Sequence, residues 1–237
     1  MNPEAFESNL NFSTYANFRN KESDFFKSEL HFVKKVIPNV HTILDIGSAS
    51  GGFYNLVRSW NPSVSYTGVE LNSQCVAHAK QLFHGIENCR FLEGSYPSVP
   101  GMQSRFELIN MFEILMLSTE WKNWLSAMLH QSKKYVTFTT RLCLKSASAL
   151  DEKTSYASYL GVQRVPYYIF NLDEFISEIH KIPVPLKKIS AYGYPMPPNP
   201  KHHHLPVHKN DVYVAQFLIE LGGDAKKPIL DLKIEES

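Results

Sequence analysis

The segment from Asp45 to Gly52 reads Asp-Ile-Gly-Ser-Ala-Ser-Gly-Gly and has the composition of a loop that binds a ligand through its backbone. Small residues let the chain turn sharply and let a ligand approach the main chain. A helix that begins directly after such a turn has unpaired N–H groups in its first turn. The spacing therefore predicts a strand, a glycine-rich turn and a helix that together hold a ligand.

Two classes of cofactor use turns of this kind. The dinucleotide pattern GxGxxG would fall on Gly47, Ala49 and Gly52, so its middle glycine is missing. Asp45 stands two positions before the first glycine, where a carboxylate would repel a pyrophosphate but suits the amino group of a methionine moiety. The turn resembles the S-adenosylmethionine-binding motif in which small residues replace the middle glycine, as in some RNA methyltransferases.

A second carboxylate follows at the end of the next expected strand. Glu70 closes the run Tyr66-Thr67-Gly68-Val69-Glu70, 19 residues after Gly51. An acid at this position accepts hydrogen bonds from the two hydroxyls of a ribose. This interpretation fits S-adenosylmethionine and NAD equally well, and the alternative is an exposed acid at a strand end.

Two further segments carry the resemblance to class I methyltransferases, which covers roughly residues 40 to 140. The segment 91–96 lies where these enzymes often have an aspartate for the adenine amino group, and Ser95 replaces it here. The segment 106–115 is similar to their fourth motif: Glu113 and Leu115 match, but the usual histidine is absent. The resemblance implies S-adenosylmethionine as the cofactor. The expected cofactor contacts are Asp45, Gly47, Ser48, Ala49, Gly51, Phe53, Glu70, Leu71, Ser95, Tyr96, Met111 and Phe112.

A shorter segment gives a narrower resemblance. Residues 167–175, with Gln163 upstream, resemble methyltransferases associated with surface-polysaccharide gene clusters. Six tyrosines of the last third could line an acceptor pocket or pack the core of a lid, since sugar rings and planar metabolites both stack on aromatic faces. They are Tyr156, Tyr159, Tyr167, Tyr168, Tyr192 and Tyr194.

Methyl transfer to a hydroxyl usually needs a general base, and three residues are candidates. Glu113 follows the fourth strand, at the edge where ligands bind in open α/β sheets; a capping or cofactor-side carboxylate is the alternative. His203 and His208 lie in the loop 201–208, and imidazole titrates in the required range. Adjacent histidines cannot all point one way, so we expect no metal site there. A solvated or packing loop is the alternative.

These residues must be positioned by alternating strands and helices. Strands are predicted at 42–46, 65–69, 90–92, 106–111, 135–140, 186–192 and 212–220, and helices at 24–37, 52–60, 73–83, 120–129 and 172–180, with Ser73 and Asn171 as helix caps. This alternation indicates a doubly wound, mostly parallel α/β sheet with helices on both faces. The resemblance implies seven strands in the order 3-2-1-4-5-7-6, with the last strand antiparallel.

The domain organisation follows from these elements. We expect one methyltransferase domain over 1–237, with an N-terminal helical extension at 1–38 and substrate-side lid insertions at 146–170 and 193–211. The charged tail after Gly223 should be peripheral.

Composition limits the partners. With 24 Lys and Arg against 23 Asp and Glu, the net charge is +1, so no basic surface for nucleic acid is expected. Three cysteines without CxxC spacing indicate free thiols in a reducing cytoplasm, and neither a signal peptide nor a membrane span is expected.

The sequence thus favours S-adenosylmethionine-dependent methyl transfer to a small molecule, with a hydroxyl, such as one on a surface-polysaccharide sugar, as the acceptor. Two alternatives stay open. One is a non-catalytic protein of the same fold that binds a partner or RNA, suggested by Ser95 and the weak catalytic signature. The other is an NAD-linked oxidoreductase, which Asp45 and Ala49 disfavour.

Overall fold

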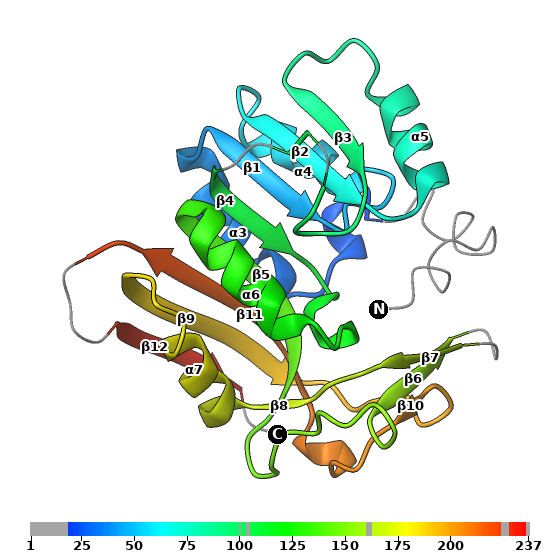
Figure 1. The fold of residues 1–237 in the computed structure, drawn as a ribbon, viewed down its shortest axis with the longest axis vertical. Coiled ribbons are helices and arrows are strands. Elements are labelled where there is room, and N and C mark those ends of the chain that lie inside the picture. Colours follow the sequence, from blue (N-terminus) through cyan, green and yellow to red (C-terminus); the bar gives the residue numbers. More distant parts are fainter. Residues whose placement is uncertain (1–18, 100, 103–104, 160–162, 224–227, 236–237) are drawn as a thin grey trace.

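The computed structural model describes residues 19–99, 101–102, 105–159, 163–223 and 228–235. One twisted sheet organises this part of the chain (Figure 1). Its strands are β1 (Thr42–Ile46), β2 (Ser65–Glu70), β3 (Cys89–Glu93), β4 (Phe106–Met111), β5 (Ser132–Cys143), β9 (Leu186–Pro195), β11 (Tyr213–Leu221) and β12 (Ile229–Ile234), with the two-residue strand β8 (Phe170–Asn171) beside β5.

The strand order is β3-β2-β1-β4-β5-β11-β9-β12. The seven predicted strands therefore lie in the expected order 3-2-1-4-5-7-6. β11 runs antiparallel to both of its neighbours, β5 and β9, whereas β1 to β5 pair in parallel. Parallel strands direct their carboxyl ends to one edge of the sheet, which brings the turn after β1 beside Glu70 and Glu113.

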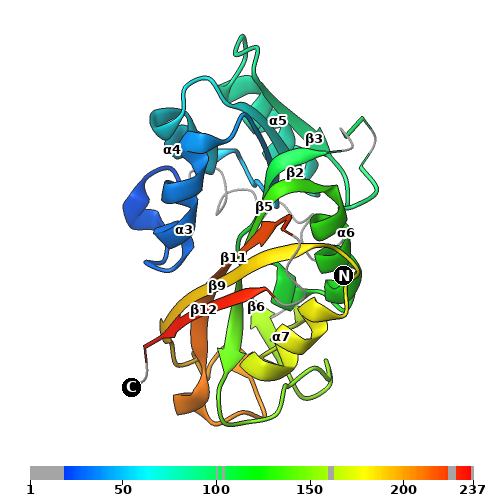
Figure 2. The same cartoon turned by 90° about the vertical axis from the view of Figure 1, so that its left-hand side faces the viewer.

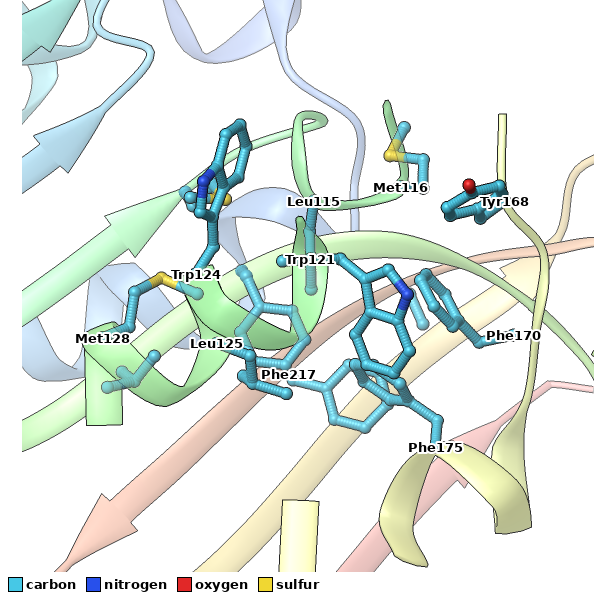
Figure 3. Packing of buried hydrophobic residues seen from close by; sticks show 14 of the residues in the cluster. Leu115, Met116, Trp121, Trp124, Leu125, Met128, Tyr168, Phe170, Phe175 and Phe217 are labelled. Carbon is cyan, nitrogen blue, oxygen red and sulfur yellow. The ribbon is translucent and has the colours of Figure 1, made fainter. Parts of the chain in front are cut away.

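Helices cover both faces of the sheet (Figures 1 and 2). One face packs against α3 (Glu29–Val36), α4 (Gly52–Trp60) and α5 (Ser73–Leu82). The other face packs against α6 (Trp121–Gln131) and α7 (Leu172–His180). Figure 3 shows the core of this second face, where Trp121 of α6 lies near Phe170 and Phe175 with ring centroids 4.8 and 5.8 Å away.

The caps explain where two of the helices begin. The Asn171 side chain accepts from the backbone N–H groups of Asp173 and Glu174, as the sequence predicts. The predicted Ser73 cap is wrong, because Asn72 accepts from the N–H of Cys75 and α5 begins at Ser73. The helix predicted over 24–37 is also too long: α3 is preceded by a separate 3₁₀ turn at Glu22–Asp24 and followed by another at Ile37–Asn39.

The segments predicted as lid insertions meet in a second, small sheet. β6 (Tyr156–Tyr159) and β7 (Gln163–Pro166) form a hairpin, and β10 (His203–His204) pairs with β6. Asp211 ties the roots of both segments together, since its carboxylate accepts from the backbone N–H groups of Leu144, Lys145 and Ser146 at 2.8–3.2 Å. The residues expected to form these insertions therefore form one structural unit.

Three expectations concern the ends of the chain. Of the N-terminal extension at 1–38, residues 1–18 lie outside the described residues. The tail after Gly223 contains an ordered edge strand, β12, which the sequence analysis did not predict. Within the ranges described above, no helix is long and apolar enough to cross a membrane.

Candidate functional site

The turn between β1 and α4 has the backbone that its composition predicts. Gly47, Ala49 and Gly51 all have positive φ angles, of 74°, 46° and 82°. A Cβ atom on Gly47 would lie 1.8 Å from Ile114 Cδ1, and one on Gly51 would lie within 2.8 Å of two phenylalanine rings. The turn is fixed to β2 because the N–H groups of Gly47 and Ser48 both donate to the Val69 carbonyl. Larger side chains are therefore excluded by both conformation and space.

Glu70 lies directly beside this turn. Its carboxylate accepts from the N–H of Ala49 at 3.0 Å and from the N–H of Asn72 at 2.9 Å. Burial raises the pKa of Glu70, while these backbone hydrogen bonds oppose the rise. The Ser48 hydroxyl is buried and has no hydrogen-bond partner among the described residues. The positive-φ turn without room for larger side chains, with the Glu70 carboxylate beside it, fits a nucleoside ligand.

Asp45 lies beneath the turn, inside the sheet. Its two oxygens accept from Asn110 Nδ2 at 2.8 Å and from the Tyr66 hydroxyl, and Thr137 donates to Asn110 Oδ1 at 2.8 Å. Burial raises the pKa of Asp45 to about 6, although the hydrogen bonds from Tyr66 and Asn110 oppose the rise. This chain of polar groups crosses four neighbouring strands. Asp45 thus anchors the turn from below, and its predicted contact with an amino group stays a prediction.

Several other expected cofactor contacts lie in the core. Phe53 and Phe112 are buried edge to face at 5.0 Å, and Phe25 covers both at 5.7 Å. The Met111 side chain is fully buried on the opposite face of the sheet. Tyr96 is also buried there, and its hydroxyl donates to Gln131 at 2.9 Å. The side chains of Met111 and Tyr96 therefore pack in the core on that face, and their assignment as cofactor contacts stays a prediction.

The remaining two expected contacts lie at the carboxyl edge. Leu71 is half-buried directly after Glu70, and Ser95 is exposed after β3. The N–H of Gly94 donates to the Glu70 carbonyl at 3.0 Å, which holds the two strand ends together. Leu71 and Ser95 thus follow the ends of neighbouring strands, and their contact with the adenine of a nucleoside stays a prediction.

Glu113 forms a buried ion pair that the sequence analysis did not predict. Both of its oxygens accept from the Arg141 guanidinium, at 2.8 Å from Nη1 and more closely from Nη2. Glu113 has a positive φ of 58°, and its N–H donates to Thr139 Oγ1 at 2.7 Å. Burial favours the neutral acid, but Arg141 outweighs it and lowers the pKa of Glu113. An ionised carboxylate in this environment is a weak base and a good hydrogen-bond acceptor.

The segments predicted as lid insertions contribute Tyr167 and His203 to the same place. The two rings are stacked at 4.3 Å, and the Arg141 guanidinium lies 5.9 Å from the Tyr167 ring. The N–H of Asn199 donates to His203 Nδ1 at 3.1 Å, which occupies the nitrogen that would accept a proton. Burial, reinforced by the charge of Arg141, lowers the pKa of His203 to about 4. The geometry therefore argues against His203 as a general base.

The other histidines point elsewhere. His204 is stacked on Tyr156 at 4.5 Å, whereas its neighbour His203 packs on Tyr167, so successive residues of β10 use opposite faces. His208 is exposed and caps a short 3₁₀ turn by accepting from the N–H of Asn210. The His208 ring serves this turn, and its assignment as a catalytic residue stays a prediction. Among the described residues, no three His, Cys, Asp or Glu side chains converge as a metal site would require.

A second buried pair adjoins the Glu113 site. Arg19 Nη2 lies 2.7 Å from Glu29 Oε1 at the start of α3, and the Glu29 side chain is fully buried. Burial raises the pKa of Glu29 to about 7, opposed by Arg19 and reinforced by the charge of Glu113. Sequence reasoning missed Arg141 and Glu29. The available signal was one arginine inside the otherwise uncharged end of β5, Tyr135 to Cys143.

Comparisons with known proteins agree with the overall fold. A family model described as a methyltransferase domain matches residues 39–183. Among solved structures, phosphoethanolamine N-methyltransferase 2 of Haemonchus contortus, in complex with S-adenosylmethionine, is similar with a TM-score of 0.63 and 14% identity, over 96% of this chain and 60% of that one. The N-terminal domain of EvdMO1, crystallised in the presence of SAH and D-fucose, is similar with a TM-score of 0.60 and 12% identity, over 94% and 98%.

A curated relative extends the comparison to nucleic-acid enzymes. Ribosomal RNA small subunit methyltransferase H of Coprothermobacter proteolyticus is 26% identical over 73 residues, which are 31% of this chain and 24% of the relative. The match spans about a quarter of that relative's length. The family model, the strand order and the turn before α4 agree, and the chain belongs to the class I, S-adenosylmethionine-dependent methyltransferases.

Proposed function

We propose that the chain transfers a methyl group from S-adenosylmethionine to a hydroxyl oxygen of a small, uncharged acceptor, with a sugar as the leading candidate. The backbone of the turn from Gly47 to Gly51 and the Ser48 hydroxyl would hold the cofactor, and Glu70 would bind its ribose. When bound, the cofactor supplies a methyl group attached to a positively charged sulfur. The protein must then align the acceptor with that methyl group and exclude water.

The observation that carries the acceptor proposal is the pairing of Glu113 with Arg141 at the ends of β4 and β5. The Glu113 side chain is 17% exposed and that of Arg141 only 5%, so the open side of the pair is the carboxylate. A carboxylate whose inner lone pairs are occupied can still accept a hydrogen bond from a hydroxyl. Glu113 would accept a hydrogen bond from the acceptor hydroxyl and hold its oxygen in line. Because the pKa of Glu113 is lowered, it would be a weak base, and the hydroxyl proton would pass to solvent water as the methyl group moves from sulfur to oxygen.

The same electrostatics favour a neutral acceptor. Arg141 is paired with Glu113 and Arg19 with Glu29, so neither arginine lacks a carboxylate partner and is left to attract a phosphate. The stacked rings of Tyr167 and His203 border this position; Tyr167 is buried, so the half-buried His203 ring is the one that would contact a sugar ring. The resemblance of residues 167–175 to methyltransferases of polysaccharide gene clusters, and the D-fucose named for the EvdMO1 structure, support a sugar.

The second candidate is a non-catalytic protein of the same fold. It is favoured by one observation: among the described residues, neither Glu113 nor His203 is placed to act as a strong base. Turnover of an acceptor distinguishes a methyltransferase from a protein that only binds the cofactor. Calorimetry with S-adenosylmethionine, S-adenosylhomocysteine and NAD tests the cofactor first, and binding of NAD alone would contradict the proposal.

The acceptor is tested with methyl-labelled S-adenosylmethionine and a panel of free sugars, nucleotide sugars and RNA. Glu113→Gln should lower the rate of label transfer to a sugar at least about tenfold, because the hydroxyl loses a charged partner. Its affinity for S-adenosylhomocysteine should be unchanged. Glu87→Gln, an exposed site in the loop before β3, is the matched control and should be fully active. Label transfer to RNA but to no sugar would refute the acceptor assignment.

A further inference from the structure

The C-terminal strand β12 forms an outer edge of the main sheet. It pairs in parallel with β9, from Ile229 opposite Lys188 to Ile234 opposite Gly193. Within the described ranges it has no other strand partner, and Figures 1 and 2 show it beyond β9 at the end of the sheet. Its outer row of backbone N–H and C=O groups is therefore available to another strand.

The residues of β12 alternate between two kinds of face. Neighbouring residues of a strand point to opposite sides of a sheet. One side has only Leu230, Leu232 and Ile234. Leu232 and Ile234 pack against the core cluster of α6 and α7, whereas Leu230 stays 48% exposed. The other side has Ile229, which is 63% exposed, followed by Asp231 and Lys233.

This pattern is complementary to itself. Suppose that a second copy of β12 pairs antiparallel with the first about a two-fold axis at Leu232. Asp231 of each copy then lies opposite Lys233 of the other, which gives two pairs of opposite charge. On the apolar side Leu230 then lies opposite Ile234 and Leu232 opposite Leu232. Opposite charges and apolar pairs directly across two strands stabilise the pairing.

The charges also exclude the neighbouring registers. Moving the axis by one residue places either Asp231 opposite Asp231 or Lys233 opposite Lys233, which is destabilising. Registers in which the two-fold axis lies midway between two residues place the apolar side of one strand against the polar side of the other. A lone edge lysine is a common device against pairing, but an acid and a base two residues apart select one antiparallel register.

We propose that the chain forms a two-fold dimer through β12, in which the two sheets join into one continuous sheet with Leu232 on the axis. This inference is independent of the proposed function. Asp231 already contacts Lys188 at 2.8 Å and Lys233 at 3.9 Å within its own chain, and both cations are partly exposed. The Asp231 carboxylate can therefore accept from Lys233 of the second copy without first losing a buried partner.

The test is the mass of the full chain in solution, measured by light scattering and sedimentation over a range of concentrations. The wild type should be a dimer. Asp231→Lys and Lys233→Asp should each raise the dissociation constant about tenfold or more, because both cross-strand pairs become repulsive. Glu87→Lys, a charge reversal away from this edge, should leave the mass unchanged. Thermal melts and S-adenosylhomocysteine binding check that each variant is folded.

Two further samples make the test specific. An equimolar mixture of the D231K and K233D variants should form heterodimers, because the two positive side chains on the polar side of one copy then face the two negative side chains of the other. The double variant D231K/K233D should dimerise by itself. If D231K does not fold, Leu230→Lys replaces it, and this variant at an exposed site should be monomeric. A monomeric wild type, unaffected single variants or a mixture that stays monomeric would overturn the proposal.

Discussion

Replacing Asp45 with asparagine tests how the buried carboxylate under the cofactor turn affects the stability of the ligand-free protein. Burial raises the pKa of Asp45 from its ordinary value of 3.8 to about 6, because the hydrogen bonds from Tyr66 and Asn110 only partly replace water. This difference corresponds to about 3 kcal/mol in favour of the protonated form when the chain folds. Asparagine keeps the size of the side chain but cannot titrate.

The sign follows from proton linkage. The folded-state pKa is above that of the unfolded chain, so protonation of Asp45 stabilises the fold completely below pH 3.8, and this stabilisation is lost as the pH rises through about 6. The unfolding free energy of the wild type minus that of D45N should therefore fall by about 2 kcal/mol between about pH 4.5 and about pH 7.5. At neutral pH D45N should be at least as stable as the wild type.

Urea denaturation followed by tryptophan fluorescence measures this difference, since Trp121 and Trp124 are buried and unfolding exposes them. Asp151→Asn, at an exposed aspartate, is the matched control and should keep the wild-type pH dependence. If D45N and the wild type differ by the same free energy at both pH values, Asp45 does not titrate as burial requires. The account of the polar chain beneath the turn would then be wrong.

Three further predictions concern packing, the ion pair and the lid. Gly51→Ala should lower the unfolding free energy by about 1–3 kcal/mol more than Gly85→Ala does. Both glycines have a positive φ, but only Gly51 has neighbouring atoms where a Cβ would lie. Equal losses of unfolding free energy in urea melts would contradict the role of crowding. Arg141→Met should lower the unfolding free energy by about 3–5 kcal/mol at neutral pH, because the mostly buried Glu113 carboxylate loses its cation. The double variant E113Q/R141M should recover part of this lost free energy. A fully stable R141M would disprove a structural role for the pair. Asp211→Ala should lose about 2 kcal/mol or more and speed tryptic cleavage in the lid, since the backbone hydrogen bonds at its root are lost. Burial opposes ionisation of Asp211, but these hydrogen bonds outweigh it and lower the pKa of Asp211. In the wild type the stability that Asp211 contributes is therefore present above pH 3.8 and is lost as the pH falls through the lower folded-state pKa. Cleavage of D211A at the wild-type rate would refute this anchor.

The alternation of strands and helices and the turn could be predicted from the sequence because both depend on local patterns, whereas the strand order was implied by the resemblance to class I methyltransferases. Apolar runs of strand length alternate with helical ones, and each parallel pair of strands needs a crossover. The agreement of α4 and α7 with the predicted ranges has the same cause, since Asn61-Pro62 ends one helix and Asn171 begins the other. Boundaries failed where tertiary pairing extended a strand, as in β5, which begins three residues before its predicted start.

The residues of the acceptor side could not be assigned from sequence because their roles depend on which strands become neighbours. Glu113 looked like a base until β5 placed Arg141 against it. Tyr96 lies three residues after the end of β3, but its ring packs in the core and its hydroxyl bonds to Gln131. Only packing distinguishes a carboxylate that takes a proton from one that holds an ion pair.

The sequence by itself determined the sheet, the glycine-rich turn and the carboxylate beside it, because periodicity, small residues and spacing act within a few residues of one another. The tertiary structure alone decided that Glu113 is paired with Arg141, that His203 but not His208 joins them, and that β12 forms an outer edge of the sheet. These outcomes depend on burial and on contacts between segments far apart in the chain, which local patterns do not specify.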